Sequence, residues 1–152
     1  MIFHFVVRHF RWLGRVPLSP QLFDALLLMC TALANRPKLR AIELLEQEVQ
    51  RHCGAELRRH RFGGTGFCIG RHELGHVHGN GLVDVFIGAA NRDVAVQNGT
   101  ALPHHIFPRS GWVSFWMKTE GDVPAAVALM RLALAWRRFA SCDASQAMMK
   151  IE

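Results

Sequence analysis

The chain has 152 residues, of which half are apolar and one fifth are charged, and this balance excludes an intrinsically disordered protein. One domain is the natural count at this length. The net charge is +6, but Lys and Arg neither cluster densely nor alternate with stacking aromatics, so we expect no nucleic-acid partner. Four widely spaced cysteines form no C-x-x-C pair, which argues against a zinc ribbon and predicts reduced, mostly buried thiols: Cys30, Cys53, Cys68 and Cys142.

Residues 1–17 have the pattern of a cationic amphipathic helix. Basic side chains recur at spacings of four, three and four and so share one helical face, while apolar residues form the other: His4, Arg8, Arg11 and Arg15. Such a helix suits a membrane interface, and docking on the domain itself is the alternative. The apolar runs are too short to span a bilayer. We therefore expect a cytoplasmic protein with peripheral membrane contact through residues 1–16.

Two helices are predicted next. The first begins with Ser19 as its N-cap and includes the apolar run 22–34, which we interpret as a buried helix. The second extends over residues 37–52, where apolar residues recur at helical spacing, and Gly54 is its expected stop.

From residue 55 onward the pattern changes to short extended segments separated by glycine-rich turns. Asn80-Gly81 lies between two such segments and predicts a hairpin, because both residues tolerate a positive φ. Pro103 and Pro108 are expected to hold residues 104–107 in extended backbone. Strands are predicted at residues 57–62, 66–69, 73–78, 82–87 and 112–118, and a short helix or irregular segment at 89–97.

The closing helix is predicted from an N-cap at Asp122 to about Ala140, with a frayed tail over residues 141–152. Helices and strands occur in blocks with short connections, which is typical of an α+β fold. We expect a single domain in which a mostly antiparallel sheet is packed by helices on one face.

Residues 71–79 concentrate the potential chemistry of the chain. A literal His-Glu-x-x-His occurs at residues 72–76, which on a helix would be a zinc-protease signature, but the neighbouring glycines disfavour a helix. We predict a strand instead, on which His76 and His78 share one face. Glu73 lies an odd number of residues from both and should face away from them, unless a bulge at Gly75 reverses its direction.

Two further histidines, His104 and His105, lie in a loop bracketed by prolines. Imidazole is both the usual metal ligand and the side chain whose pKa best suits proton transfer near neutral pH. One interpretation is a zinc site whose ligands include His76, His78 and His104, with Glu73 or Asp84 nearby. The other is a metal-free base site in a pocket lined by Trp112 and Trp116. Hydrogen-bonded structural histidines are the remaining alternative.

These motifs together resemble the luciferase-like domain family, which contains the fungal luciferases and many small bacterial proteins. The resemblance covers roughly residues 55–140 and, with the bacterial members, extends back to about residue 18. It therefore divides the chain into residues 1–17, a domain at 18–140 and the tail. The residues that carry it are Arg71, Glu73, His76, His78, Asp84, Pro103-His104-His105 and Ser110 to Phe115.

The resemblance implies an oxygenase that needs neither metal nor organic cofactor and acts on a small, electron-rich, enol-type or hydroxypyrone-like substrate. It implies catalytic roles for His76, His78, His104, His105 and Glu73, with substrate contacts from Trp112, Trp116, Asp84 and Arg71. One imidazole of the His76–His78 pair would be the base, and one of the His104–His105 pair would orient the oxyanion. We expect no light emission. The alternatives are a Zn²⁺-dependent hydrolase that uses the histidine-rich segment, and a non-enzymatic module that binds a small molecule or a membrane surface.

Overall fold

The computed structural model describes the backbone of residues 19–149 and the side chains of residues 19–140. Its elements, in chain order, are α2 (Ser19–Ala34), α3 (Arg36–Cys53), β1 (Glu56–Arg59), β2 (Thr65–Ile69), β3 (His72–Val77), β4 (Leu82–Phe86), α4 (Ala89–Gln97), β5 (Leu102–Pro103), β6 (Trp112–Trp116), the 3-10 turn η2 (Glu120–Asp122) and α5 (Val123–Met149). The predicted amphipathic helix of residues 1–17 lies outside the described residues.

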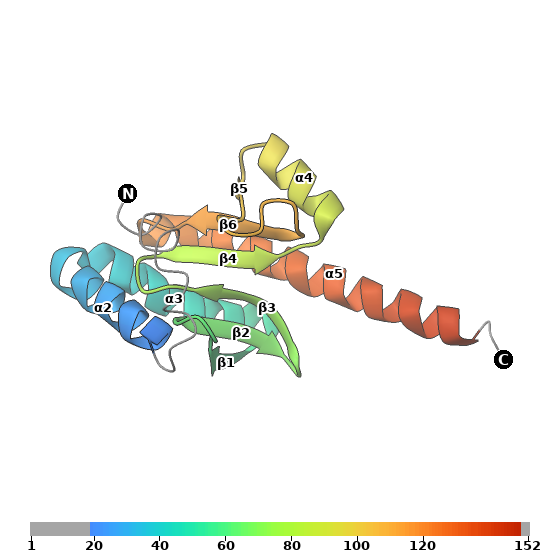
Figure 1. The fold of residues 1–152 in the computed structure, drawn as a ribbon, viewed down its shortest axis with the longest axis horizontal. Coiled ribbons are helices and arrows are strands. Elements are labelled where there is room, and N and C mark those ends of the chain that lie inside the picture. The colour runs from blue at the N-terminus through green and yellow to red at the C-terminus, as the bar shows by residue number, and fades with distance from the viewer. Residues whose placement is uncertain (1–18, 150–152) are drawn as a thin grey trace.

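The strands form one six-stranded sheet in the order β1-β2-β3-β4-β6-β5, and each neighbouring pair is antiparallel. Helices α3 and α5 pack against each other, and α5 lies along β3 and β4 on one side of the sheet (Figure 1). The short helix α4 contacts β5 and β6 at the edge. The predicted α+β fold, with an antiparallel sheet and helices on one face, is therefore confirmed.

The hydrophobic core lies between the sheet and helices α3 and α5. The strands contribute almost fully buried apolar residues to this core: Phe67, Leu74, Val77, Val83, Val85 and Val113. On β4 they alternate, as period-two patterning requires. From the helices, Leu45, Val49 and Met130 fill the same layer. A side chain at Gly75 would meet the Asp84 carbonyl oxygen at 2.5 Å and the Met130 Cε at 2.9 Å, so glycine allows α5 to pack closely on β3.

Most element bounds agree with the sequence, and the helix signals explain why. Asn35 caps α3 by accepting the backbone N–H of Lys38, and Gly54 ends that helix at a φ of +64°, as predicted. The first strand ends at Arg59 instead of residue 62, because the chain turns back at Gly63, whose N–H donates to the His60 carbonyl. Helix α5 continues to Met149, so its predicted end near Ala140 was wrong; residues 141–149 contain no Gly or Pro to stop it.

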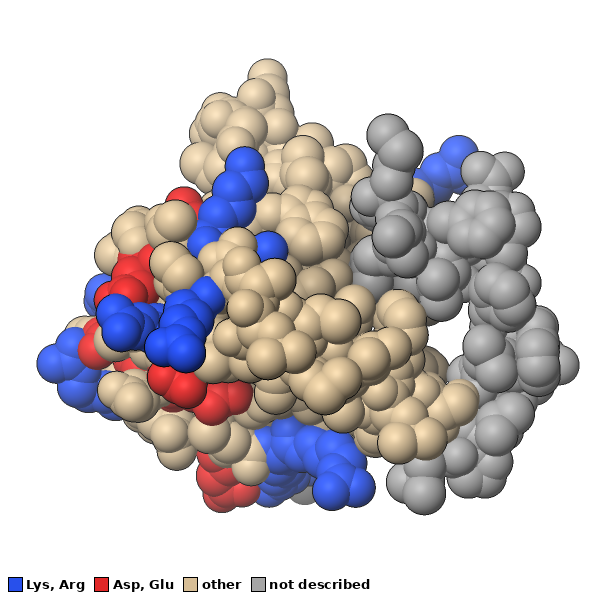
Figure 2. Space-filling model, turned by 90° about the vertical axis from the view of Figure 1, so that its left-hand side faces the viewer, with Lys and Arg blue, Asp and Glu red and all other residues tan. Residues whose placement is uncertain are grey.

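We predicted that α2 is a buried helix, but its apolar residues face outward and its polar residues face the domain. Its leucines point outward, with Leu22 71% and Leu33 81% exposed, whereas Asp24 and Thr31 are its buried residues. The cause is Asp24, which accepts the Gly79 N–H at 2.9 Å and so anchors the polar face of α2 to the β3–β4 turn. Figure 2 views the molecule from this side and shows a broad surface without charged residues, bordered by both basic and acidic side chains.

Two further expectations concern the described part of the chain. None of its helices is long and apolar enough to cross a membrane. Cys53 and Cys68 are buried and reduced, as expected, but Cys30 is exposed on α2 because that helix turns its apolar side outward.

Candidate functional site

Strand β3 contains a bulge that brings Glu73 to the same side as His76. In its pairing with β2, Phe67 faces Gly75 but the next residue, Cys68, faces Glu73, so Leu74 is an extra residue. The Nδ1 of His76 donates to Glu73 Oε1 at 2.7 Å. Glu73 therefore does not face away from the histidines as it would on a regular strand. The alternative that we named, a bulge at Gly75, is the one observed, with Leu74 as the extra residue. The zinc-protease reading is wrong, because residues 72–77 form a strand.

His78 follows β3 directly, and its ring lies 5.0 Å from that of His76 on the same face of the sheet. The Asn80-Gly81 turn that follows is the predicted hairpin, with Gly81 at a φ of +82° and the His78 N–H donating to the Leu82 carbonyl. The Nδ1 of His78 lies 3.3 Å from Asp24 Oδ1 on α2. Each of the two histidines thus has its Nδ1 against a carboxylate.

Asp84, on β4, is the centre of the cluster and is 0% exposed. Its Oδ1 accepts a short hydrogen bond from the Ser114 hydroxyl on the adjacent strand β6. Its Oδ2 faces four imidazole nitrogens, namely His76 Nε2 at 3.5 Å, His78 Nε2 at 3.8 Å, His104 Nε2 at 3.7 Å and His105 Nδ1 at 3.7 Å. These separations exceed ordinary hydrogen-bond lengths, and no described residue donates a normal hydrogen bond to Oδ2.

The loop after β5 supplies His104 and His105, whose rings stack at 4.5 Å. The Nδ1 of His104 accepts the backbone N–H groups of Ile106 and Phe107 at 3.1 and 3.0 Å. These bonds bend the chain at residues 105–106, so the predicted extended backbone over 104–107 is wrong beyond His104. Because Nδ1 is an acceptor, the neutral ring carries its hydrogen on Nε2, which faces Asp84.

His60 is a member of the cluster that the sequence did not single out. It follows β1, and its ring stacks on His76 with centroids 3.6 Å apart and an interplanar angle of 11°. Its Nδ1 lies 3.2 Å from the Gly63 carbonyl oxygen, and its Nε2 lies 3.5 Å from Glu73 Oε1. The only sequence signal for this arrangement was the glycine-rich segment at residues 63–66, where the chain reverses so that β2 pairs with β1.

Burial and neighbouring charges act on the pKa values of the cluster in opposite directions. Burial lowers the pKa of His76, but the carboxylates of Asp84 and Glu73 outweigh burial and raise this pKa to about 9. Burial raises the pKa of Asp84, but the facing imidazoles of His105 and His76 lower it well below its ordinary value.

Burial also lowers the pKa of two other imidazoles to about 4. For His60 the charge on nearby His76 acts in the same direction, and for His104 burial outweighs the opposing effect of Asp84. Near neutral pH the cluster therefore holds an ion pair between His76 and Asp84, next to the neutral imidazoles of His60 and His104.

The other predicted site residues lie at different distances from this centre. Trp112 is a wall of the cluster, with its ring 5.6 Å from His76 and 5.9 Å from His104. Trp116 is half-buried and lies four residues along β6, on the strand face that also carries Ser114. Arg71 lies in the β2–β3 turn with an exposed side chain, outside the buried cluster.

Exposed apolar side chains surround the buried imidazoles. Phe62 is 50% exposed and contacts His60 edge-on with centroids 5.7 Å apart. Phe107 is 55% exposed and stacks on His104 at 5.5 Å.

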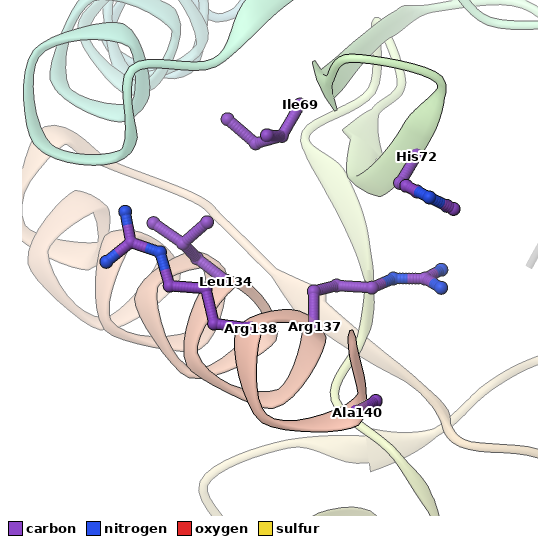
Figure 3. A pocket seen from close by; sticks show the side chains of 6 residues that line it. All are labelled: Ile69, His72, Leu134, Arg137, Arg138 and Ala140. Carbon is purple, nitrogen blue, oxygen red and sulfur yellow. The ribbon is translucent and has the colours of Figure 1, made fainter. Parts of the chain in front are cut away.

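The pocket in Figure 3 is a different feature. It has a volume of about 410 Å³ and lies between α5 and the end of the β2–β3 hairpin, lined by Ile69, His72, Leu134, Arg137, Arg138 and Ala140. Arg137 has structural partners here, since it donates to the Glu73 carbonyl at 3.4 Å and lies over the Phe86 ring. The pocket expected among the histidines is therefore not this one.

Comparison with known proteins gives one match, which covers the segment that contains most of the cluster. Residues 71–133 match the family model described as Luciferase domain. The matched segment contains Glu73, His76, His78, Asp84, His104 and His105. No curated protein and no solved structure gives a significant match to the chain. The resemblance inferred from the sequence is thus confirmed, whereas Asp24 and His60 lie outside the matched segment.

Proposed function

We propose that this luciferase-like domain protein is an oxygenase acting on a small, electron-rich substrate with an acidic enol-type hydrogen. One observation carries the proposal: the carboxylate–imidazole pairs Asp24–His78 and Glu73–His76 both direct their Nε2 atoms toward buried Asp84. A carboxylate that holds the Nδ1 hydrogen of an imidazole orients Nε2 as a base. The family match supports the same class of activity.

The tautomers divide the roles among the imidazoles. His78, with Nδ1 against Asp24, takes the substrate proton on Nε2. His104 presents an N–H at Nε2, and His76 is an imidazolium, so both can donate hydrogen bonds to the oxygen of the enolate that forms. A preorganised pair of donors stabilises that negative charge without a reorganisation step.

The reaction needs no oxidant beyond O₂. Transfer of the substrate proton to His78 leaves an enolate, whose electron pair passes to O₂ in two one-electron steps and forms the new carbon–oxygen bond. The distal oxygen of the resulting peroxide then takes up the proton that His78 received, and this transfer restores the neutral base. The buried position of the cluster protects the peroxide from water.

The rim of the cluster favours a planar substrate. Phe62 and Phe107 are half-exposed rings on two sides of the histidines, and Trp112 lies behind them. Flat, unsaturated rings such as hydroxypyrones or polyphenols can stack on such surfaces.

The test is O₂ consumption by the purified chain with a panel of hydroxypyrones and polyphenols. We expect saturable uptake with at least one of them, its loss in His78→Ala, and its retention in the control His72→Ala, since His72 is exposed on the same strand. Saturable binding of these compounds without O₂ uptake would instead support the non-enzymatic alternative.

A further inference from the structure

We propose that the centre of the cluster binds a divalent first-row transition metal ion through His76 Nε2, His78 Nε2 and Asp84 Oδ2. The inference concerns the same site as the proposed function but does not depend on its reaction. It rests on three observations: the spacing of the ligand atoms, the carboxylates behind the two imidazoles, and the burial of Asp84.

The spacing fits a metal site better than a hydrogen-bonded one. The two nitrogens lie 3.5 and 3.8 Å from Asp84 Oδ2, and all three ligand atoms lie within 4.8 Å of one another. Hydrogen-bonded partners would lie about 2.7 to 3.0 Å apart. Ligands that each lie about 2.1 Å from an ion stand roughly 3.0 to 3.4 Å from one another. The two distances to Asp84 Oδ2 therefore need to shorten by only a few tenths of an ångström.

The carboxylates of Glu73 and Asp24 determine which nitrogen of each imidazole faces Asp84. Glu73 accepts from Nδ1 of His76, and Asp24 lies against Nδ1 of His78, so each neutral ring has its lone pair on Nε2. Both Nε2 atoms face the Asp84 carboxylate. In the metal-free site a proton on His76 Nε2 lies between that ring and the carboxylate, and a bound cation would take the place of that proton. Carboxylate–histidine–metal arrangements of this kind recur in metalloproteins because they fix the tautomer and orient the ring.

The third ligand is Asp84 and not His104. The two backbone N–H groups that His104 accepts at Nδ1 leave its hydrogen on Nε2, so that nitrogen offers no lone pair to an ion. Asp84 Oδ2 is fully buried and receives no normal hydrogen bond from the described residues. The proposed ligands therefore differ from the sequence-based set of His76, His78 and His104.

Two imidazoles and one carboxylate leave coordination positions open, and this set suits Fe²⁺ or Zn²⁺. The ion would supply a Lewis acid at the same point where the metal-free site uses imidazole groups. In the metal-bound form His78 is a ligand, and it acts as a base only in the metal-free form.

The test uses the full chain without a histidine tag, dialysed against Zn²⁺ or Co²⁺ and then analysed for bound metal. We expect about one ion per chain. His76→Ala, His78→Ala and Asp84→Asn should each weaken binding by about 100-fold or more, and Asp24→Asn or Glu73→Gln by about 10- to 100-fold. Two controls should bind as the wild type does: His72→Ala, which removes the exposed histidine of the His-Glu-x-x-His motif, and His104→Asn, which keeps an acceptor for the loop.

The outcomes separate this inference from the oxygenase function. Failure of the wild-type chain to bind Zn²⁺ and Co²⁺ overturns the metal site, as does a loss of binding in His72→Ala equal to that in His76→Ala. Stoichiometric binding, with no O₂ uptake by either the metal-free or the metal-bound chain, supports the metal site and contradicts the oxygenase. Because the wild-type measurement needs no variant, the proposal stays testable even if Asp84→Asn does not fold, which circular dichroism would show.

Discussion

Strand β4 is buried on both faces of the sheet, but by apolar side chains on one face and by polar and charged ones on the other. On the helix side, Val83 and Val85 are fully buried among apolar side chains from α3 and α5. Between them on the same strand, Asp84 is equally buried on the other side, where loops and the end of α2 bring imidazoles and carboxylates together. One strand of five residues therefore contributes to a hydrophobic core and to a polar cluster.

This difference indicates which face carries stability and which carries chemistry. Apolar burial stabilises a fold by roughly 25 cal/mol per Å², whereas a buried charge is unfavourable unless it is paired. Replacing buried ion pairs by apolar residues is often neutral or stabilising, so a buried Asp–His cluster is poorly explained by stability alone. We infer that the cluster is retained for binding or catalysis, and the predictions below test that division.

The largest expected effect is on turnover. His78→Ala removes the base of the metal-free site or a ligand of the metal-bound site, and either loss should lower the rate by roughly 10²- to 10⁴-fold. Steady-state O₂ uptake measures it, with circular dichroism to show that the fold is intact. A variant that unfolds would contradict the division, because it would make the cluster structural.

The second effect is on stability and should arise on the opposite face. Leu74 is fully buried beneath α5, so Leu74→Ala should lower the free energy of unfolding by about 2 to 5 kcal/mol. Urea denaturation measures the loss. Ser114→Ala, on the site face, is the matched comparison, and a larger loss there than at Leu74 would contradict our assignment of stability to the helix face.

The sequence predicts the helix face better than the site face, for a physical reason. Core positions on strands alternate and those on helices recur every three to four residues, so Val83 or Leu45 can be recognised from neighbours nearby in the chain. Glycine and Asn signals likewise fixed the end of α3 and the β3–β4 hairpin. Local signals failed where a long-range contact prevailed, as at α2, where Asp24 turned the leucines outward.

The cluster itself was predicted in part. The i, i+2 spacing of His76 and His78 indicated a shared face, and that needed no tertiary information. The position of Glu73 depended on a bulge, for which Gly75 was a local signal that named the alternative but could not decide it. His60 and Asp24 are brought in by loop and helix packing over long separations in the chain, so spacing could not reveal them.

The third prediction concerns residues 1–16, which lie outside the described residues. Because the amphipathic pattern stops before Pro17, deletion of residues 1–16 should shift the thermal midpoint by only a few degrees, a loss of about 1 to 2 kcal/mol. We propose that this segment and the exposed leucines of α2 contact anionic lipid, so the deletion should also reduce sedimentation with anionic vesicles. Loss of soluble expression would show instead that residues 1–16 complete the core.

The smallest expected effect lies at the rim of the site face. The Phe107 ring is half-exposed and stacks on His104. The backbone N–H of Phe107 donates to His104 Nδ1, and a side-chain substitution leaves that hydrogen bond in place. Phe107→Ala should therefore leave kcat nearly unchanged and raise KM by roughly two- to tenfold, the equivalent of one lost aromatic stacking contact of about 0.5 to 1.5 kcal/mol. The matched control is Phe139→Ala, an exposed ring on α5 that should change neither constant. Equal effects of the two substitutions would mean that the rim does not contact substrate, and a fall in kcat alone would mean that Phe107 positions His104 instead of binding a ring.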